Sequence, residues 1–188
     1  MEYRELEIPG VWLLTPRRHG DARGYFAETY RKAEFDAATG RTVEFVQDNE
    51  STSSGGVLRG LHFQRGASAQ AKLVRVIEGT VVDVALDLRR HSPTFGRHVM
   101  VTLDDTRGEM LFIPRGFAHG FLVLSTRARF LYKVDNYYDP AAEVSLRFDD
   151  PDVAICWPEV DFPLNLSPKD LKGLSWSQLI DNNLTYDF

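Results

Sequence analysis

Residues 73–89, LVRVIEGTVVDVALDLR, carry the pattern that decides the fold. Two runs rich in Val, Ile and Leu flank Glu78, Gly79 and Thr80, and such runs around a short turn are typical of a β-hairpin. In the second run, four apolar side chains alternate with Asp83 and Asp87. This alternation predicts a strand with one buried face and one face in contact with water.

The same rhythm of short strands and turns extends from about residue 57 to residue 146. Residues 110–138 predict three further strands, broken at 114–116 and at 125–127, because Pro and Gly interrupt strands. Closely spaced strands without long helices between them are typical of a β-sandwich or barrel. The fold class is therefore predicted as all-β.

Helices are scarce in the sequence. A short helix at about residues 32–38 is expected to end at Gly40, and another is expected to begin at Ser167 with Pro168 at its first position. The Ser- and Gly-rich residues 51–56 suggest a mobile loop between strands, either a plain connector or a lid. We expect the few helices to lie at the periphery of the β-structure.

Composition limits the classes of protein to consider. With 188 residues, of which 43% are hydrophobic, the chain has material for one core, so a single domain spanning 1–188 is expected. The formal charge of -5 argues against a nucleic-acid-binding protein. The lone Cys156 is predicted to be a small buried residue before Trp157, and a single thiol suits the cytoplasm. The acidic N-terminal residues do not resemble a signal peptide.

Residues 56–76, GVLRGLHFQRGASAQAKLVRV, contain the densest group of chemically capable side chains. Arg59, His62 and Lys72 would form a positive site with a titratable imidazole, and histidine is well suited to proton abstraction near neutral pH. Because Arg59 and His62 have opposite parity in a regular strand, a bulge at Gly60 is needed to bring both to one face. A hydrogen-bonded structural histidine remains the alternative.

Three further segments carry candidates. His119 follows the turn of IPRGFAHGF, where a core role and a ligand contact are equally consistent. Tyr132 and Tyr138 share parity in FLYKVDNYYDP and would serve as an acid or a stacking ring, or simply pack in the core. In LSPKDLKG, Ser167 and Asp170 have the spacing of a capping box.

The chain resembles the dTDP-4-dehydrorhamnose 3,5-epimerase family, whose members are cupin-like jelly-roll barrels that act without a metal or nicotinamide cofactor. Stretches with this resemblance occur in family order along nearly the whole chain: DARGYFAETY (21–30), FVQDNESTSSGGVLRGLHFQ (45–64), QAKLVRVIEG (70–79), SPTFG (92–96), IPRGFAHGF (113–121), YKVDNYYDP (132–140) and LRFDDP (146–151). We therefore expect epimerisation at C3 and C5 of a dTDP-linked 4-keto-6-deoxyhexose.

The resemblance also implies roles for individual residues. His62 would be the proton acceptor and Tyr132 the proton donor, with Asp170 pairing with His62 or acting as the helix cap, or both. Lys72 is our candidate for stabilising the enolate oxygen. The implied substrate contacts are Arg23, Glu28, Gln47, Asn49, Arg59, Lys72, His119, Tyr138, Glu143 and Lys169. Exchange of the N-terminal strands, at about residues 1–50, would make a homodimer.

Three other functions remain open from the sequence. An epimerase of the same architecture that inverts only C3 or only C5 would need the same acid and base. A metal-dependent cupin usually gathers two or three histidines with a carboxylate, whereas LHFQ supplies one histidine. A non-catalytic sugar-nucleotide-binding module would keep the arginines without needing both His62 and Tyr132.

Overall fold

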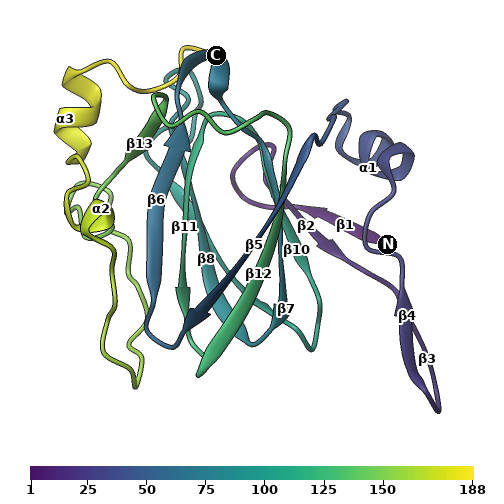
Figure 1. The fold of residues 1–188 in the computed structure, drawn as a ribbon. Coiled ribbons are helices and arrows are strands. Elements are labelled where there is room, and N and C mark those ends of the chain that lie inside the picture. The colour runs from purple at the N-terminus through teal and green to yellow at the C-terminus, as the bar shows by residue number, and fades with distance from the viewer.

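The computed structural model describes residues 1–188, and it consists of two antiparallel sheets packed face to face (Figure 1). The six-stranded sheet has the order β1 (Glu2–Glu5), β2 (Trp12–Thr15), β10 (Met110–Ile113), β7 (Lys72–Glu78), β12 (Arg127–Val134) and β5 (Gln47–Ser54). The five-stranded sheet has the order β13 (Glu143–Ser145), β6 (Leu58–Gln64), β11 (Phe117–Val123), β8 (Thr80–Asp87) and β9 (His98–Asp104). This is the predicted all-β, cupin-like jelly roll.

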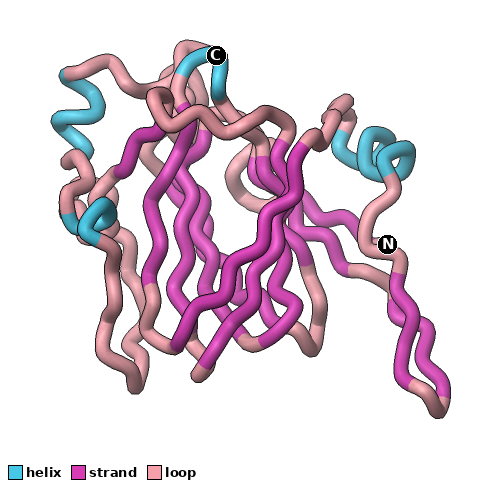
Figure 2. Tube along the Cα trace, in the orientation of Figure 1, coloured by secondary structure: helices cyan, strands magenta, loops and turns pink.

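The helices lie outside the two sheets (Figure 2). They are α1 (Lys32–Thr39), α2 (Pro168–Leu171) and α3 (Trp176–Asp181), with one 3-10 turn at Gly66–Ser68. The predicted helix ends are confirmed, since Gly40 ends α1 in the left-handed conformation and Ser167 precedes Pro168 as the N-cap of α2. None of these helices is both long and apolar enough to cross a membrane.

The predicted β7–β8 hairpin is wrong. The two strands follow each other directly at Gly79, but β7 pairs with β10 and β12 while β8 pairs with β11 and β9. Gly79 has a φ of 83°, and a Cβ there would lie 2.1 Å from the carbonyl oxygen of Arg127. The segment is thus a corner at which the chain crosses from one sheet to the other.

The predicted water-facing side of β8 is also wrong, because Asp83 and Asp87 are both 0% exposed. One face of β8 belongs to the core between the sheets, and its other face packs against the C-terminal segment through Val84 and Leu86. Each buried aspartate has partners from outside its own strand: Asp83 binds His119, and Asp87 binds Arg89. Burial of both faces is possible because these carboxylates are hydrogen-bonded.

Two smaller expectations fail as well. Residues 51–54 are not a loop but the second half of β5, hydrogen-bonded along β12, so that only Gly55 and Gly56 turn the chain. Cys156 is exposed rather than buried, because it lies in an irregular segment in which Ile155 and Trp157 supply the apolar contacts. The three strands expected within residues 110–138 are confirmed as β10, β11 and β12.

Candidate active site

A bulge in β6 brings Arg59 and His62 to the inner face of the five-stranded sheet. His62 lies opposite His119 and Arg59 lies opposite Phe121, so three steps along β6 match two along β11. Gly60, with a φ of 117°, occupies the bulge, and a Cβ at this position would lie 2.6 Å from Gly120 Cα. Only glycine fits here, and the extra residue removes the parity conflict between Arg59 and His62.

His62 is paired with Asp170. Its Nε2 lies 2.6 Å from Asp170 Oδ1, and its side chain is 23% exposed. Burial would raise the pKa of Asp170, but hydrogen bonds from His62 and Ser167 outweigh it and hold that pKa at about 2. Since an ionised carboxylate only accepts, neutral His62 must carry its proton on Nε2. The lone pair is then on Nδ1, which makes no hydrogen bond within the protein.

A second histidine is held in a buried chain of three side chains. His119 Nε2 donates to Asp83 Oδ2 at 2.9 Å, and His119 Nδ1 lies 3.5 Å from Lys72 Nζ. Burial lowers the pKa of His119 despite the charge of Asp83, so this imidazole is neutral at pH 7. Burial lowers the pKa of Lys72 to about 8, with Asp83 and Glu143 opposing the effect. An ammonium therefore persists on the inner face at neutral pH.

Tyr132 stands on the opposite sheet, on the same inward-facing side of β12 as Phe130. It lies between Asn49 of β5 and Val74 of β7 in the register. Burial raises the pKa of Tyr132, with Arg59 acting in the other direction, so the phenol keeps its proton at pH 7. Asn49 also accepts a hydrogen bond from Gln47 Nε2 at 2.8 Å.

Three predicted contact residues form a network beside His62. Glu143 accepts hydrogen bonds from Lys169 Nζ at 2.6 Å and from Tyr138 Oη at 2.9 Å. It lies on β13, two positions before Ser145, which pairs with His62 of β6. Burial would raise the pKa of Glu143, but these two hydrogen bonds lower it. The network links the Tyr138 ring to the helix that carries Asp170.

Arg23 and Glu28 do not join this group within one chain. Arg23 lies in the turn between β3 (Arg18–Asp21) and β4 (Gly24–Ala27), a two-stranded hairpin that projects from the body of the molecule (Figure 1). The Arg23 side chain is 89% exposed and pairs only with Asp21, while Glu28 pairs with Arg31. Within one chain, these two residues therefore lie outside the group around His62.

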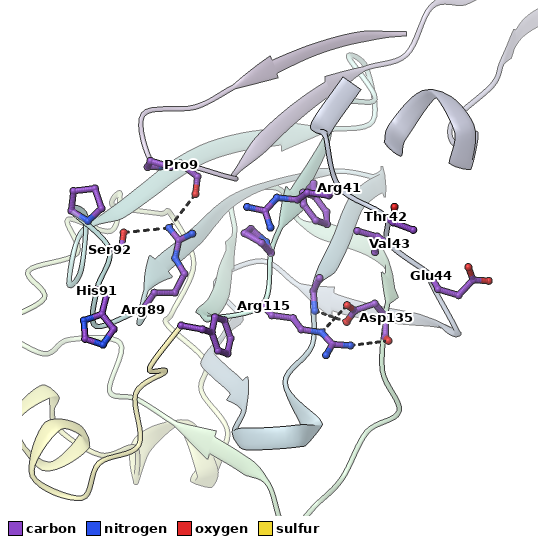
Figure 3. Close-up of a pocket in the computed structure, with 15 residues that line it drawn as sticks. Pro9, Arg41, Thr42, Val43, Glu44, Arg89, His91, Ser92, Arg115 and Asp135 are labelled. Carbon is purple, nitrogen blue, oxygen red and sulfur yellow. Dashed lines mark hydrogen bonds and ion pairs between the residues drawn. The ribbon is translucent and has the colours of Figure 1, made fainter. Parts of the chain in front are cut away.

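A large surface cavity of about 770 Å³ lies elsewhere and contains none of the predicted site residues (Figure 3). Arg89 and Arg115 line it, but they are already bound to Asp87 and Asp135. Arg41 also lines it and forms no ion pair, so the cavity keeps one free guanidinium, but the residues with family-implied roles all lie elsewhere. The candidate active site is instead the inner face around His62. The protein has no group of three or more His, Cys, Asp or Glu side chains suited to holding a metal ion.

Two residues of this site were not predicted as such. The alternation in β8 predicts that Asp83 faces water, although an aspartate within an apolar strand also indicates a buried hydrogen-bond partner. Ser167 was noted only as a helix cap. Its hydroxyl also donates to Asp170 Oδ2 at 2.6 Å, so the cap and the His62 pair share one carboxylate.

Comparison with known proteins gives consistent matches over most of the chain. A family model described as dTDP-4-dehydrorhamnose 3,5-epimerase matches residues 5–178. The enzyme of that name from Salmonella typhimurium is 52% identical over 163 residues, which cover 87% of this chain and 88% of the relative.

Solved structures show the same similarity. A Legionella pneumophila 3,5-epimerase, solved in complex with dTDP-4-keto-L-rhamnose, has a TM-score of 0.93 and 43% identity, covering 100% of this chain and 98% of its own. A 3'-monoepimerase from Streptomyces bikiniensis, solved with dTDP-quinovose, has a TM-score of 0.91 and 34% identity, covering 97% and 91%.

Proposed function

The chain belongs to the dTDP-4-dehydrorhamnose 3,5-epimerase family, and on this premise we propose how its inner face performs the reaction. It is an isomerase that inverts C3 and C5 of dTDP-4-dehydro-6-deoxy-D-glucose to give dTDP-4-dehydro-L-rhamnose. The C4 ketone acidifies the protons on both neighbouring carbons, because the negative charge left by their removal is delocalised onto oxygen. Each inversion therefore needs a base, a stabilised enolate and an acid on the opposite face of the ring.

The observation that carries the proposal is the tautomer of His62. Asp170 holds the proton on Nε2, which leaves Nδ1 as a free lone pair on a side chain that remains partly exposed. This nitrogen takes the proton from C3 or C5, and the adjacent carboxylate stabilises the imidazolium that forms. A positioned base of this kind contributes on the order of 10²–10⁴ in rate.

Lys72 stabilises the enolate. The C–H electron pair moves into the ring as the proton leaves, and the charge that develops on the C4 oxygen is met by the ammonium group. His119 keeps Nδ1 toward Lys72, so the ammonium has a fixed neighbour on one side. Such stabilisation acts mainly in the transition state, which raises the rate rather than only the affinity.

Tyr132 returns a proton from the opposite sheet. Its raised pKa keeps the phenol protonated until a strong base, the enolate carbon, is available. After delivery to the face opposite His62, the phenolate is reprotonated while His62 releases its proton, so the enzyme returns to its starting state.

The remaining residues bind the nucleotide and sugar. Arg59 and Lys169 supply positive charge for the diphosphate, and Tyr138 supplies an exposed ring for the base. Gln47, Asn49 and Glu143 offer amide and carboxylate groups for hydroxyls. We assign His119, the hydrogen-bonded neighbour of Lys72, to the C4 oxygen as well.

We also propose a homodimer of single-domain subunits, located in the cytoplasm. The projecting β3–β4 hairpin supports it, because Phe26 is 71% exposed and Arg23 and Glu28 form ion pairs only with residues two or three positions away, Asp21 and Arg31. Insertion of this hairpin into a second subunit would bury the ring and add the guanidinium and the carboxylate to the partner site.

Incubation with dTDP-4-keto-6-deoxyglucose in D2O, followed by NMR, tests the proposal. Label at both C3 and C5 with formation of the L-rhamno product is expected, and a Tyr132→Phe variant should still take up deuterium while losing most inversion. Label at one carbon would instead support the single-position function, which the similarity to the 3'-monoepimerase keeps as the second candidate. Absence of label at either carbon would refute both.

A further inference from the structure

Asp170 is only 2% exposed, and both oxygens of its carboxylate accept hydrogen bonds from the protein. Oδ1 accepts from His62 Nε2 at 2.6 Å and from the Gly60 backbone N–H at 3.2 Å. Oδ2 accepts from the Ser167 hydroxyl at 2.6 Å and from the Ser167 backbone N–H at 3.3 Å. Ser167 is therefore the only side chain that hydrogen-bonds to Oδ2.

The helix α3 begins with the same kind of capping box, but its box makes no bond to a histidine. Ser175 accepts from the Gln178 backbone N–H at 3.2 Å, and Gln178 Oε1 accepts from the Ser175 N–H at 2.9 Å. There the third residue of the box is a neutral amide and serves the helix alone. In α2 the equivalent position holds a carboxylate that also binds His62.

We propose that Ser167 is a positioning residue for proton transfer: its hydroxyl fixes the plane of the Asp170 carboxylate and limits the negative charge offered to His62. Each hydrogen bond that a carboxylate accepts disperses its charge, so the pull on the His62 N–H depends on how firmly Ser167 holds Oδ2. The proposal rests on the proposed role of His62 as base.

The other charged groups near His62 are balanced. Glu143 on β13 is neutralised by Lys169 of α2 and receives a further hydrogen bond from Tyr138. His119 on β11 faces His62 across the strand pair, and burial lowers its pKa so that it stays uncharged at pH 7. Lys72 on β7 keeps its ammonium beside His119 and is unchanged in every Ser167 variant, whereas Asp170 is the one side chain hydrogen-bonded to His62.

The test compares Ser167→Ala with Ser167→Thr and with the matched cap variant Ser175→Ala. The His62 ring is titrated by NMR in the free protein, assigned by loss of its signal in His62→Gln, and kcat/KM is measured against pH. Removing the Ser167 hydroxyl should move the imidazole midpoint and the acidic limb of kcat/KM upward by about half a pH unit. Ser167→Thr should restore both.

Both alanine variants should lower the Tm by about 2–4 °C, because each loses a helix cap. Only Ser167→Ala should change the titration. Equal losses of Tm with an unshifted His62 midpoint would overturn the proposal and leave Ser167 as a cap alone. A shifted midpoint in a protein that never exchanges substrate protons would show that Ser167 acts on His62 through Asp170 but would refute the proposed function and, with it, the role in proton transfer; the two failures are distinguishable because the NMR titration needs no substrate.

Discussion

Two histidine–aspartate pairs lie on neighbouring strands, and they differ in what meets the second ring nitrogen. His62 and His119 face each other across β6 and β11, and each directs Nε2 at a buried carboxylate. The Nδ1 of His119 is 3.5 Å from the Lys72 ammonium, whereas the Nδ1 of His62 has no partner in the protein. The same pairing thus leaves a free base at His62 and a fixed, neutral dipole at His119.

The two carboxylates also come from different kinds of structure. Asp83 belongs to a central strand and is held by the sheet on both sides. Asp170 belongs to a four-residue helix, and its position depends on the Ser167 cap. In the proposed mechanism, the pair in the sheet organises the ammonium that stabilises the enolate, and the pair at the helix end supports the group that changes its protonation state in every turnover.

Replacement of the two histidines should produce the largest difference between the pairs. His62→Ala removes the base and should lower kcat by on the order of 10²–10⁴. It should also abolish deuterium uptake from D2O at C3 and C5. His119→Ala removes a side chain assigned to the C4 oxygen but leaves His62 and the Lys72 ammonium, so deuterium uptake should slow but persist at both carbons. Normal deuterium uptake by His62→Ala would contradict the assignment of His62 as the base. So would a complete loss of uptake in His119→Ala but not in His62→Ala.

Turn and helix-cap residues in the sequence correctly predict the parts of the fold that depend on local interactions. The breaks at Pro114–Gly116 and Ser125–Arg127, and the ends of α1 and α2, follow from backbone preferences of nearby residues. The partners of β7 and β8 do not. A Gly-centred connection is compatible with a hairpin or with a crossing between sheets, and the choice depends on strands farther along the chain, such as β10 and β11.

The site divides in the same way. The family resemblance implies His62, Lys72, Tyr132 and Asp170 as candidates, and the structure brings the first, second and fourth into hydrogen-bonded pairs. The role of Asp83 escaped the sequence analysis because its partner is 36 positions away on another strand. Alternation alone assigned it to water, whereas its burial depends on a histidine that only the folded sheet brings close.

The contribution of Asp170, which is hydrogen-bonded to both His62 and Ser167, to the free energy of unfolding should depend on pH. The pKa of Asp170 is about 2 in the folded protein, below the unfolded value of about 3.9, so its contribution is complete above about pH 5 and is lost progressively as the pH falls through 2. That contribution should be about 2 kcal/mol at pH 7. Denaturant unfolding of the wild type and Asp170→Asn at pH 7 and pH 3 measures it.

The control for this measurement is Asp149→Asn. Arg147 also lowers the pKa of Asp149, but that ion pair is about half exposed, so its loss should cost only about 0–1 kcal/mol. An equal effect of both substitutions would mean that the His62–Asp170 pair stabilises the fold no more than a surface ion pair does.

The smallest expected effect concerns the pair in the sheet. Asp83→Asn keeps a hydrogen-bond acceptor for His119 but removes the negative charge that opposes the burial-lowered pKa of Lys72, which is about 8. The alkaline limb of kcat should therefore move down by on the order of one pH unit, which costs roughly fivefold at pH 8 and little at pH 6. Asp87→Asn is the matched control, because Asp87 is equally buried on β8 but binds Arg89. Asp87→Asn should lower the stability of the protein without moving the alkaline limb of kcat. An equal shift of this limb in both variants would show that Asp83 affects kcat through the stability of the fold and not through the pKa of Lys72.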